Sequence, residues 1–348
     1  MQSSKLALGL LSILLFLGAC GSGTAPTDEG ASADRDRPTV VVTTNILGDV
    51  VHNLVGDHFE VVTLMPVGSD PHDFQPSAQE IAQLETADAI IVNGGGFEEG
   101  LLDVVEGATE DGVPVFEALS VVNPLAPGDE QYNHDEHDAD DHDADDHDAD
   151  EHHNEGEDYD DHGHHHGGTD PHFFADPARM LVAAQGVMDF LIDTVDGADA
   201  EALQADAAPY LAELSALDEE VESILAEIPE HHRTLLTNHE VYAYFADRYA
   251  FTLVGAVIPG GSTTDAANAQ DLAALAEKLM ALDAPAVFTD TSSSDELAQV
   301  LAEEVGDVPI VELYSESLGA AGSDGATYLD MVRTNAQRIA SALAAGDA

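Results

Sequence analysis

The sequence predicts an α/β protein with two Rossmann-like lobes, each a parallel sheet flanked by helices, joined by one long linking helix. Short aliphatic runs alternate with helical patterns over residues 39–116, and the same alternation returns over residues 234–344. Between them, Ala200 to Ile228 contains no glycine and carries apolar residues at helical spacing. Because strands that alternate with helices return in the same direction, both sheets are expected to be parallel.

The first lobe is assigned to residues 39–198. It opens with a β-branched run at Thr39–Thr43, followed by a helix over 46–54. A helix starting after Asp176 is also expected, because a proline in its first turn loses no hydrogen bond. The remaining elements are strands at 59–65, 87–93 and 113–116 and a helix at 78–85.

The linking helix is assigned to residues 199–229 and would be roughly 40 Å long at 1.5 Å per residue. Pro209 either kinks this helix or marks its start. The second lobe takes residues 230–348. Its expected strands are 234–237, 251–258, 286–289 and 308–313, alternating with helices at 241–249, 267–282, 294–305 and 328–344. A hinge made of a helix would allow only small movements between the lobes.

The charge of the chain excludes one class of function. Nine Lys and Arg face 69 Asp and Glu, a formal net charge of −60. A nucleic-acid binder needs clustered cations to neutralise phosphates, and nine cannot supply them. The absence of Trp also argues against sugar- or base-stacking surfaces.

The N-terminus has the pattern of an export signal. Residues 1–19 contain Lys5 and an apolar run over 6–17 that is too short to span a bilayer, which takes about 20 residues. Cys20, the sole cysteine, follows two small residues and resembles the lipid-modified cysteine of bacterial lipoproteins. Residues 20–38 are polar and rich in Gly, Ser and Pro, which is typical of a flexible tether.

A low-complexity segment interrupts the first lobe at 126–169, where a disordered loop is expected. Between His134 and His166 there are 16 acidic residues and 10 histidines in 33 positions. Such tracts bind divalent metals weakly through neutral imidazole, so capture should fall below about pH 6.5. The alternative is a disordered acidic loop without a role in metal capture. The ten histidines are His134, His137, His142, His147, His152, His153, His162, His164, His165 and His166.

Seven histidines lie outside this tract. His72 and His239 follow predicted strands, at the edge where open α/β sheets bind ligands, and His172 lies in an Asp-Pro-His sequence that repeats the one ending at His72. Pro71 directly precedes His72 and Pro171 directly precedes His172, and each proline stiffens its loop. The other four are expected to be ordinary surface residues: His52, His58, His231 and His232.

Three imidazoles and one carboxylate make a closed tetrahedral zinc site. The candidates for the carboxylate are Glu240, Asp290 and Glu316, which all lie in or next to loops after predicted strands. Periodicity alone does not choose among them.

With these loops, the two lobes and the lipid anchor, residues 39–346 resemble the solute-binding lipoproteins of bacterial ABC importers for zinc and manganese. The motifs that carry the resemblance are Asp70-Pro71-His72, Ala-Asp-Ala-Ile-Ile-Val-Asn-Gly at 87–94, and Asp170-Pro171-His172 followed by Asp176-Pro177.

The resemblance implies two ligands from each lobe: His72 and His172, then His239 and a late carboxylate. That carboxylate is usually an Asp between small residues. Here Ser315-Glu316-Ser317 occupies its place, so Glu316 is assigned with Asp290 in reserve.

The resemblance also implies zinc, because family members with histidine at the third ligand position favour Zn²⁺ and those with a carboxylate there favour Mn²⁺, in line with the preference of Mn²⁺ for harder oxygen donors. A zinc-binding protein is therefore expected, with a manganese protein or a metal-dependent surface adhesin as alternatives. The resemblance further implies an ABC permease as partner, an extracytoplasmic location, attachment to the membrane by lipid only, and a monomer. An enzyme is not expected, because His239-Glu240 lacks the second histidine of a zincin helix and no Gly-x-Ser-x-Gly or phosphate-binding loop occurs.

Overall fold

The computed structural model describes residues 37–125, 169–258, 263, 269–282, 286–292, 296–306 and 308–344, all within one compact unit, Arg37–Ala348. The predicted signal peptide, Cys20, the tether up to residue 36 and the His/Asp tract with its ten histidines lie outside the described residues. Within the described ranges, no helix is both long enough and apolar enough to cross a membrane.

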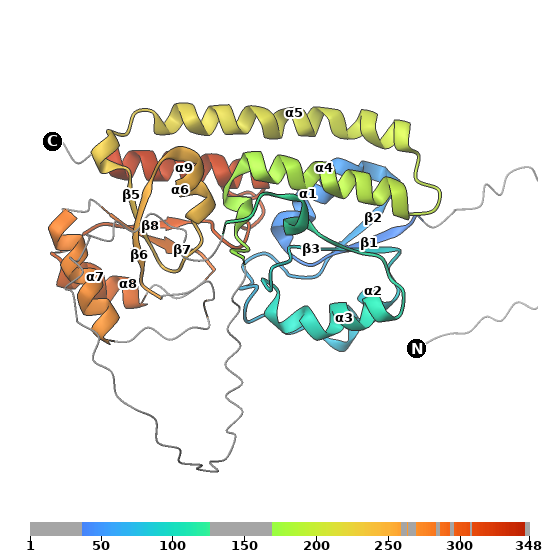
Figure 1. Ribbon diagram of the computed structural model, residues 1–348, viewed down its shortest axis with the longest axis horizontal. Helices are drawn as coiled ribbons and strands as arrows, with labels where there is room; N and C mark the ends of the chain where they lie inside the picture. Colours follow the sequence, from blue (N-terminus) through green and yellow to red (C-terminus); the bar gives the residue numbers. More distant parts are fainter. Residues whose placement is uncertain are drawn as a thin grey trace, which may run out of the picture. The chain divides into compact units, whose positions relative to one another are not determined.

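The N-lobe is built on one parallel sheet with strand order β2-β1-β3-β4. Helices α1 and α4 cover one face and α2 and α3 the other (Figure 1). Each face packs its own core, because Val40 and Val42 of β1 point to α1 and α4 while Val41 points to the opposite side. The elements are β1 (Thr39–Val42), α1 (Asn45–Val55), β2 (Glu60–Thr63), α2 (Ala78–Glu85), β3 (Ala89–Val92), α3 (Leu102–Glu110), β4 (Val115–Glu117) and α4 (Pro177–Thr194).

The C-lobe contains two parallel strand pairs, β5 with β6 and β7 with β8, and β5 lies next to β7. Helices α7 and α8 pack against these strands around Leu236, Val287 and Leu301. The elements are β5 (Thr234–Thr237), α6 (Ala243–Tyr249), β6 (Thr252–Ala256), α7 (Ala269–Leu282), β7 (Val287–Asp290), α8 (Glu296–Glu304), β8 (Ile310–Leu313) and α9 (Tyr328–Ala344).

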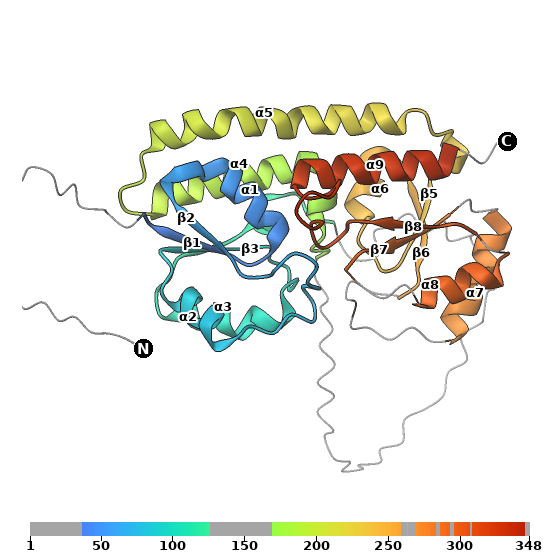
Figure 2. The ribbon, with the colours of Figure 1, turned by 180° about the vertical axis from the view of Figure 1, so that it is seen from behind.

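Helix α5 (Ala200–Leu225) joins the two lobes and runs along both of them (Figures 1 and 2). It starts at Ala200, where the Asp199 side chain accepts a hydrogen bond from Ala202 N, and continues through Pro209. The prediction that Pro209 marks the start of the helix is therefore wrong, because Pro209 lies inside α5. Apolar residues of α5 pack against α1, α4 and α9, so one core extends through both lobes.

The predicted α/β class is confirmed, but α3 is missing from the prediction. Its sequence contains Gly107, a weak helix former, and it has no side-chain cap at its start, unlike α2, which begins with a Ser77–Glu80 capping box. The described residues also include short 3₁₀ turns at Gly56–His58, Glu99–Leu101, Ala118–Val121, Phe173–Ala175 and Glu230–His232.

Helix α1 lies unusually close to strand β2. A side chain at Gly48 would overlap the hydroxyl of Thr63, so glycine is needed for this approach. The Thr44 hydroxyl accepts a hydrogen bond from Leu47 N and caps the helix. Together these contacts fix the first residue of α1, Asn45, at the carboxyl end of β1.

Candidate metal centre

The structure brings together four side chains from four separate segments: His72, His172, His239 and Glu316. Three of these residues follow strands, since His72 comes after β2, His239 after β5 and Glu316 after β8. His172 instead lies just before the 3₁₀ turn that leads into α4. All four residues are at most 4% exposed, and one ligand atom from each lies within 4.8 Å of the others.

One carboxylate oxygen lies at the centre of this group. Oε1 of Glu316 is 2.9 Å from Nε2 of His72, 3.3 Å from Nε2 of His172 and 2.9 Å from Nε2 of His239. The three Nε2 atoms therefore face the same point, which is the arrangement that a tetrahedral metal ion requires of its donors.

The two Asp-Pro-His sequences form matching turns. The Asp70 carboxylate accepts a hydrogen bond from the backbone N–H of His72 at 2.9 Å, and Asp170 does the same for His172 at 2.8 Å. Each aspartate thus holds the backbone of the histidine two residues later. The second carboxylate oxygen of Asp70 accepts a hydrogen bond from the Thr263 hydroxyl at 2.6 Å.

Carboxylates also hold the outer nitrogens of both N-lobe histidines. Nδ1 of His172 is 2.8 Å from Asp170 Oδ1, and Nδ1 of His72 is 3.2 Å from Glu99 Oε1. Such partners fix the ring orientation and leave Nε2 free to bind a metal. Glu99 was not predicted from the sequence, whereas the repeated Asp-Pro-His sequence gave a signal for the Asp170 contact.

An aromatic wall closes the N-lobe side of the centre. Phe97 packs edge-on against His72 and His172, with ring centroids 5.1 and 5.5 Å apart. It follows a turn of three glycines at 94–96, all with positive φ, between 69° and 88°.

Buried Glu98 holds this turn by accepting hydrogen bonds from the Thr43 hydroxyl and Asn93 N, and burial raises the pKa of Glu98. The Asn93 amide donates to Pro171 O at 2.9 Å, which ties the turn to the His172 loop. These supporting residues were not predicted either.

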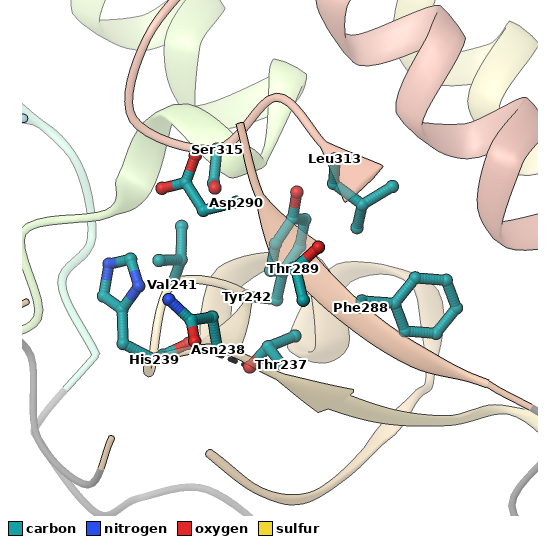
Figure 3. A pocket seen from close by; sticks show the side chains of 10 residues that line it. All are labelled: Thr237, Asn238, His239, Val241, Tyr242, Phe288, Thr289, Asp290, Leu313 and Ser315. Atoms are coloured by element: carbon teal, nitrogen blue, oxygen red, sulfur yellow. Dashed lines mark hydrogen bonds between the residues drawn. The ribbon is translucent and has the colours of Figure 1, made fainter. Parts of the chain in front are cut away.

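The C-lobe side is built differently. The Thr237 hydroxyl donates to the backbone carbonyl of His239 at 2.8 Å, but His239 Nδ1 has no hydrogen-bond partner among the described residues. Figure 3 shows the His239 ring and the Asp290 carboxylate on the same side of a small cavity, which has room for about one water molecule.

The two other carboxylates considered for the fourth position do not join the four-residue group. Asp290 is buried at the end of β7, where its Oδ1 accepts hydrogen bonds from Ser292 N and Oγ at 2.7 and 2.9 Å. Burial, and then the charge of Glu316, raise the pKa of Asp290 to about 6. Glu240 also lies outside the group. The geometry thus favours Glu316, as the resemblance implied.

The charges of the centre depend on each other. Burial would raise the pKa of Glu316, but the surrounding histidines, led by His239, hold it well below its usual range. Burial likewise disfavours a charged His172, yet Asp170 and Glu316 raise its pKa to about 9, and the pKa of His72 is raised through Glu316. Without metal, His172 is therefore protonated at neutral pH, and a metal ion must displace this proton.

The other four histidines lie apart from the centre. His52 and His231 are exposed, and His58 and His232 are partly exposed. His58 pairs with Asp206 at 2.8 Å, on the side of α5.

Comparisons with known proteins identify the family of the chain. The family model described as "Zinc-uptake complex component A periplasmic" matches residues 40–342. The chain is 26% identical to the manganese-binding lipoprotein MntA of Halalkalibacterium halodurans, over 95% of this chain and 97% of that protein. It is also 26% identical to the manganese ABC transporter substrate-binding lipoprotein PsaA of Streptococcus pneumoniae, over 99% of each chain.

Among solved structures, the periplasmic zinc binding protein TroA from Treponema pallidum matches with a TM-score of 0.71 at 24% identity, over 88% of this chain and 99% of that one. This likeness shows the fold. The chain belongs to the zinc-uptake complex component A family, the extracytoplasmic substrate-binding components of metal ABC importers.

Proposed function

We propose that this chain binds Zn²⁺ through His72, His172, His239 and Glu316 and delivers it to the permease of an ABC importer. The observation that carries the proposal is the position of Glu316 Oε1, within 3.3 Å of all three Nε2 atoms. Three nitrogen donors and one carboxylate, all buried, form a closed site that holds a metal rather than a catalytic site with an open position for water.

The donor set supports zinc. Imidazole suits Zn²⁺, whereas Mn²⁺ favours sites rich in oxygen donors, and this centre supplies only one carboxylate. The description of the family as a zinc-uptake component is consistent with this choice.

Manganese is the second candidate, because MntA and PsaA are named for it. Tight zinc binding would not exclude manganese transport, since zinc binds more tightly than manganese to most sites. The discriminating measurement is metal accumulation in cells that depend on this importer. Manganese uptake that persists in a zinc-depleted medium, and zinc uptake that does not depend on the chain, would favour the second candidate.

The binding site is tested by zinc titration against a competing chelator, in a chain starting at residue 21. Residues 126–168 are replaced by a short linker, so that the His/Asp tract does not contribute. The replacement is feasible because Asp170 N donates to Leu125 O at 3.1 Å, which places the two ends side by side.

We expect tight one-to-one binding that His239→Ala abolishes and the matched change His58→Ala leaves intact, because His58 lies outside the centre. Absence of tight binding in the tract-free chain would contradict the proposal.

Two further parts of the proposal rest on the sequence. Cys20 would carry the lipid that anchors a monomeric chain, and the tract would collect zinc near the centre. Unchanged zinc uptake at limiting zinc after removal of the tract would disprove the capture role.

A further inference from the structure

One buried side chain of the N-lobe contacts the segment that carries Glu316. Asn45 is 6% exposed and accepts a hydrogen bond from Leu318 N at 2.8 Å. Its amide group donates to Ser317 Oγ at 3.0 Å and to Pro66 O at 3.2 Å. The donor and acceptor ends of Asn45 are thus both used, which fixes the orientation of its side chain.

The same serine reaches the loop of another proposed ligand. Ser317 Oγ accepts a hydrogen bond from Gly68 N at 2.6 Å, and Gly68 precedes His72 in the loop after β2. The residues Asn45, Gly68, Ser317 and Leu318, here called the interlobe latch, therefore connect the His72 loop of one lobe with the Glu316 loop of the other.

The interlobe latch lies where the strand order of the N-lobe sheet changes direction. Strand order β2-β1-β3-β4 reverses between β1 and β3, and Asn45 lies at the carboxyl end of β1. In open α/β sheets this switch point is where ligands bind. Here it receives the loop of the second lobe, because Asn45 contacts Ser317 and Leu318. Figure 2 shows the chain between β8 and α9 turning beside α1.

A second contact with the same segment lies farther from the centre. Asp49, one turn after Asn45 on α1, accepts a hydrogen bond from Tyr328 N at 2.9 Å. Both α1 residues thus hold the segment between β8 and α9, but only Asn45 does so beside Glu316.

We propose that Asn45 is a positioning residue that holds Glu316 and His72 at metal-binding distance, so that the interlobe latch sets how long the metal stays bound. The proposal rests on the proposed function of the centre. Release requires donors of the two lobes to separate, and the latch bonds must break in the same movement. Because Asn45, Ser317 and Leu318 are buried, water does not replace the hydrogen bonds between them until the lobes part.

The test is the rate at which one equivalent of bound Zn²⁺ passes to an excess of chelator, in the chain from residue 21 onward. Weak binding by the tract would exchange fast and leave the slow phase to the centre. We expect release on the order of tenfold faster in Asn45→Ala and in Ser317→Ala, as for the loss of one or two buried hydrogen bonds. The double variant should be little faster than either single variant, since both remove the same connection.

Asp49→Ala is the matched control. It removes an interlobe hydrogen bond of α1 and should lower the melting temperature, yet leave zinc release within about twofold of the parent chain. The absorption spectrum of bound Co²⁺ should be unchanged in Asn45→Ala, because the donors are the same.

Parent-like release in both Asn45→Ala and Ser317→Ala would overturn the proposal, as would equal acceleration by Asp49→Ala. If Asn45→Ala fails to fold, Ser317→Ala decides. Failure of the proposed function is recognised separately, because His239→Ala would then release zinc at the parent rate.

Discussion

The two lobes hold their proposed ligands in different ways. In the N-lobe, His72 and His172 lie in stiff Asp-Pro-His turns, and their Nδ1 atoms face Glu99 and Asp170. In the C-lobe, His239 Nδ1 has no hydrogen-bond partner among the described residues, and Glu316 lies in a loop fixed by contacts with the other lobe. The outer nitrogens of both N-lobe histidines therefore face carboxylates of their own lobe, although the C-lobe also contacts these turns through Thr263 and Tyr244. The loop of Glu316 is held from the other lobe by Asn45.

This difference suggests an order of events. Metal would meet a preformed pair of imidazoles on the N-lobe first, and the C-lobe donors would complete the site as the lobes close. Release would begin with His239, since no partner among the described residues holds its outer nitrogen.

The largest effect is expected from the central carboxylate. Glu316→Ala should lower zinc affinity by more than roughly a hundredfold, beyond what loss of an outer contact costs. Asp290→Ala is the matched change at a buried carboxylate outside the group and should cost much less. Competitive titration measures both, and a larger loss from Asp290→Ala would show that the donor of the C-lobe has been misidentified.

The next largest loss of zinc affinity is expected from the two carboxylates that face the Nδ1 atoms of the N-lobe histidines, Asp170 and Glu99. Asp170→Asn should weaken zinc binding by about 10- to 100-fold, because it removes the charge that orients His172. Glu99→Gln should have a smaller effect, because Glu99 is partly exposed and its contact with His72 is longer, at 3.2 Å. Equal effects would mean that burial does not determine how strongly these partners act.

Proton coupling provides a third measurement. With a pKa of about 9, metal-free His172 is protonated at pH 7. Its raised pKa stabilises the metal-free fold. This contribution is complete below pH 6.5 and is lost as the pH rises to about 9. Metal binding has the opposite sign, because it needs the neutral ring. Zinc affinity should rise by up to about tenfold per pH unit between pH 7 and 9. Calorimetry in buffers of different ionisation enthalpy counts the protons released; a count near zero at pH 7 would contradict this.

The smallest effect on zinc affinity is expected from removing the side-chain hydrogen bond to the backbone of His239. Thr237→Val removes the hydrogen bond to His239 O and should cost about 1 kcal/mol of stability and a few-fold in zinc affinity. Thermal unfolding and titration measure the two effects. A loss as large as that of Asp170→Asn would show that the C-lobe orients His239 as firmly as the N-lobe orients His172.

Local patterns were enough to predict the strand ends that carry His72 and His239, because short aliphatic runs bounded by polar turns are visible in the chain. The limits of α2, β5 and α9 agree with the predicted ones, and most other elements differ by one to three residues at their ends. Helix α3 was missed because it contains Gly107 and has no capping side chain to mark its start.

The arrangement around the centre could not be read from periodicity. Asn45 and Ser317 are 272 positions apart, and nothing in either local sequence announces their contact. Asp290 and Glu316 both come from C-lobe strands, and only the folded structure shows that Ser292 holds one while the other faces the histidines. The family resemblance, rather than the hydrophobic periodicity, had favoured Glu316 over Asp290 as the fourth ligand.

The close packing of α1 on β2 has a genetic consequence. Any side chain at position 48 would push α1 away from Thr63 and carry Asn45 away from the other lobe. A substitution there changes no atom next to the proposed ligands. In a selection for growth at scarce metal it would nevertheless be scored as a metal-starvation allele, and it would be suppressed by changes that make room at Thr63 rather than by changes at the centre.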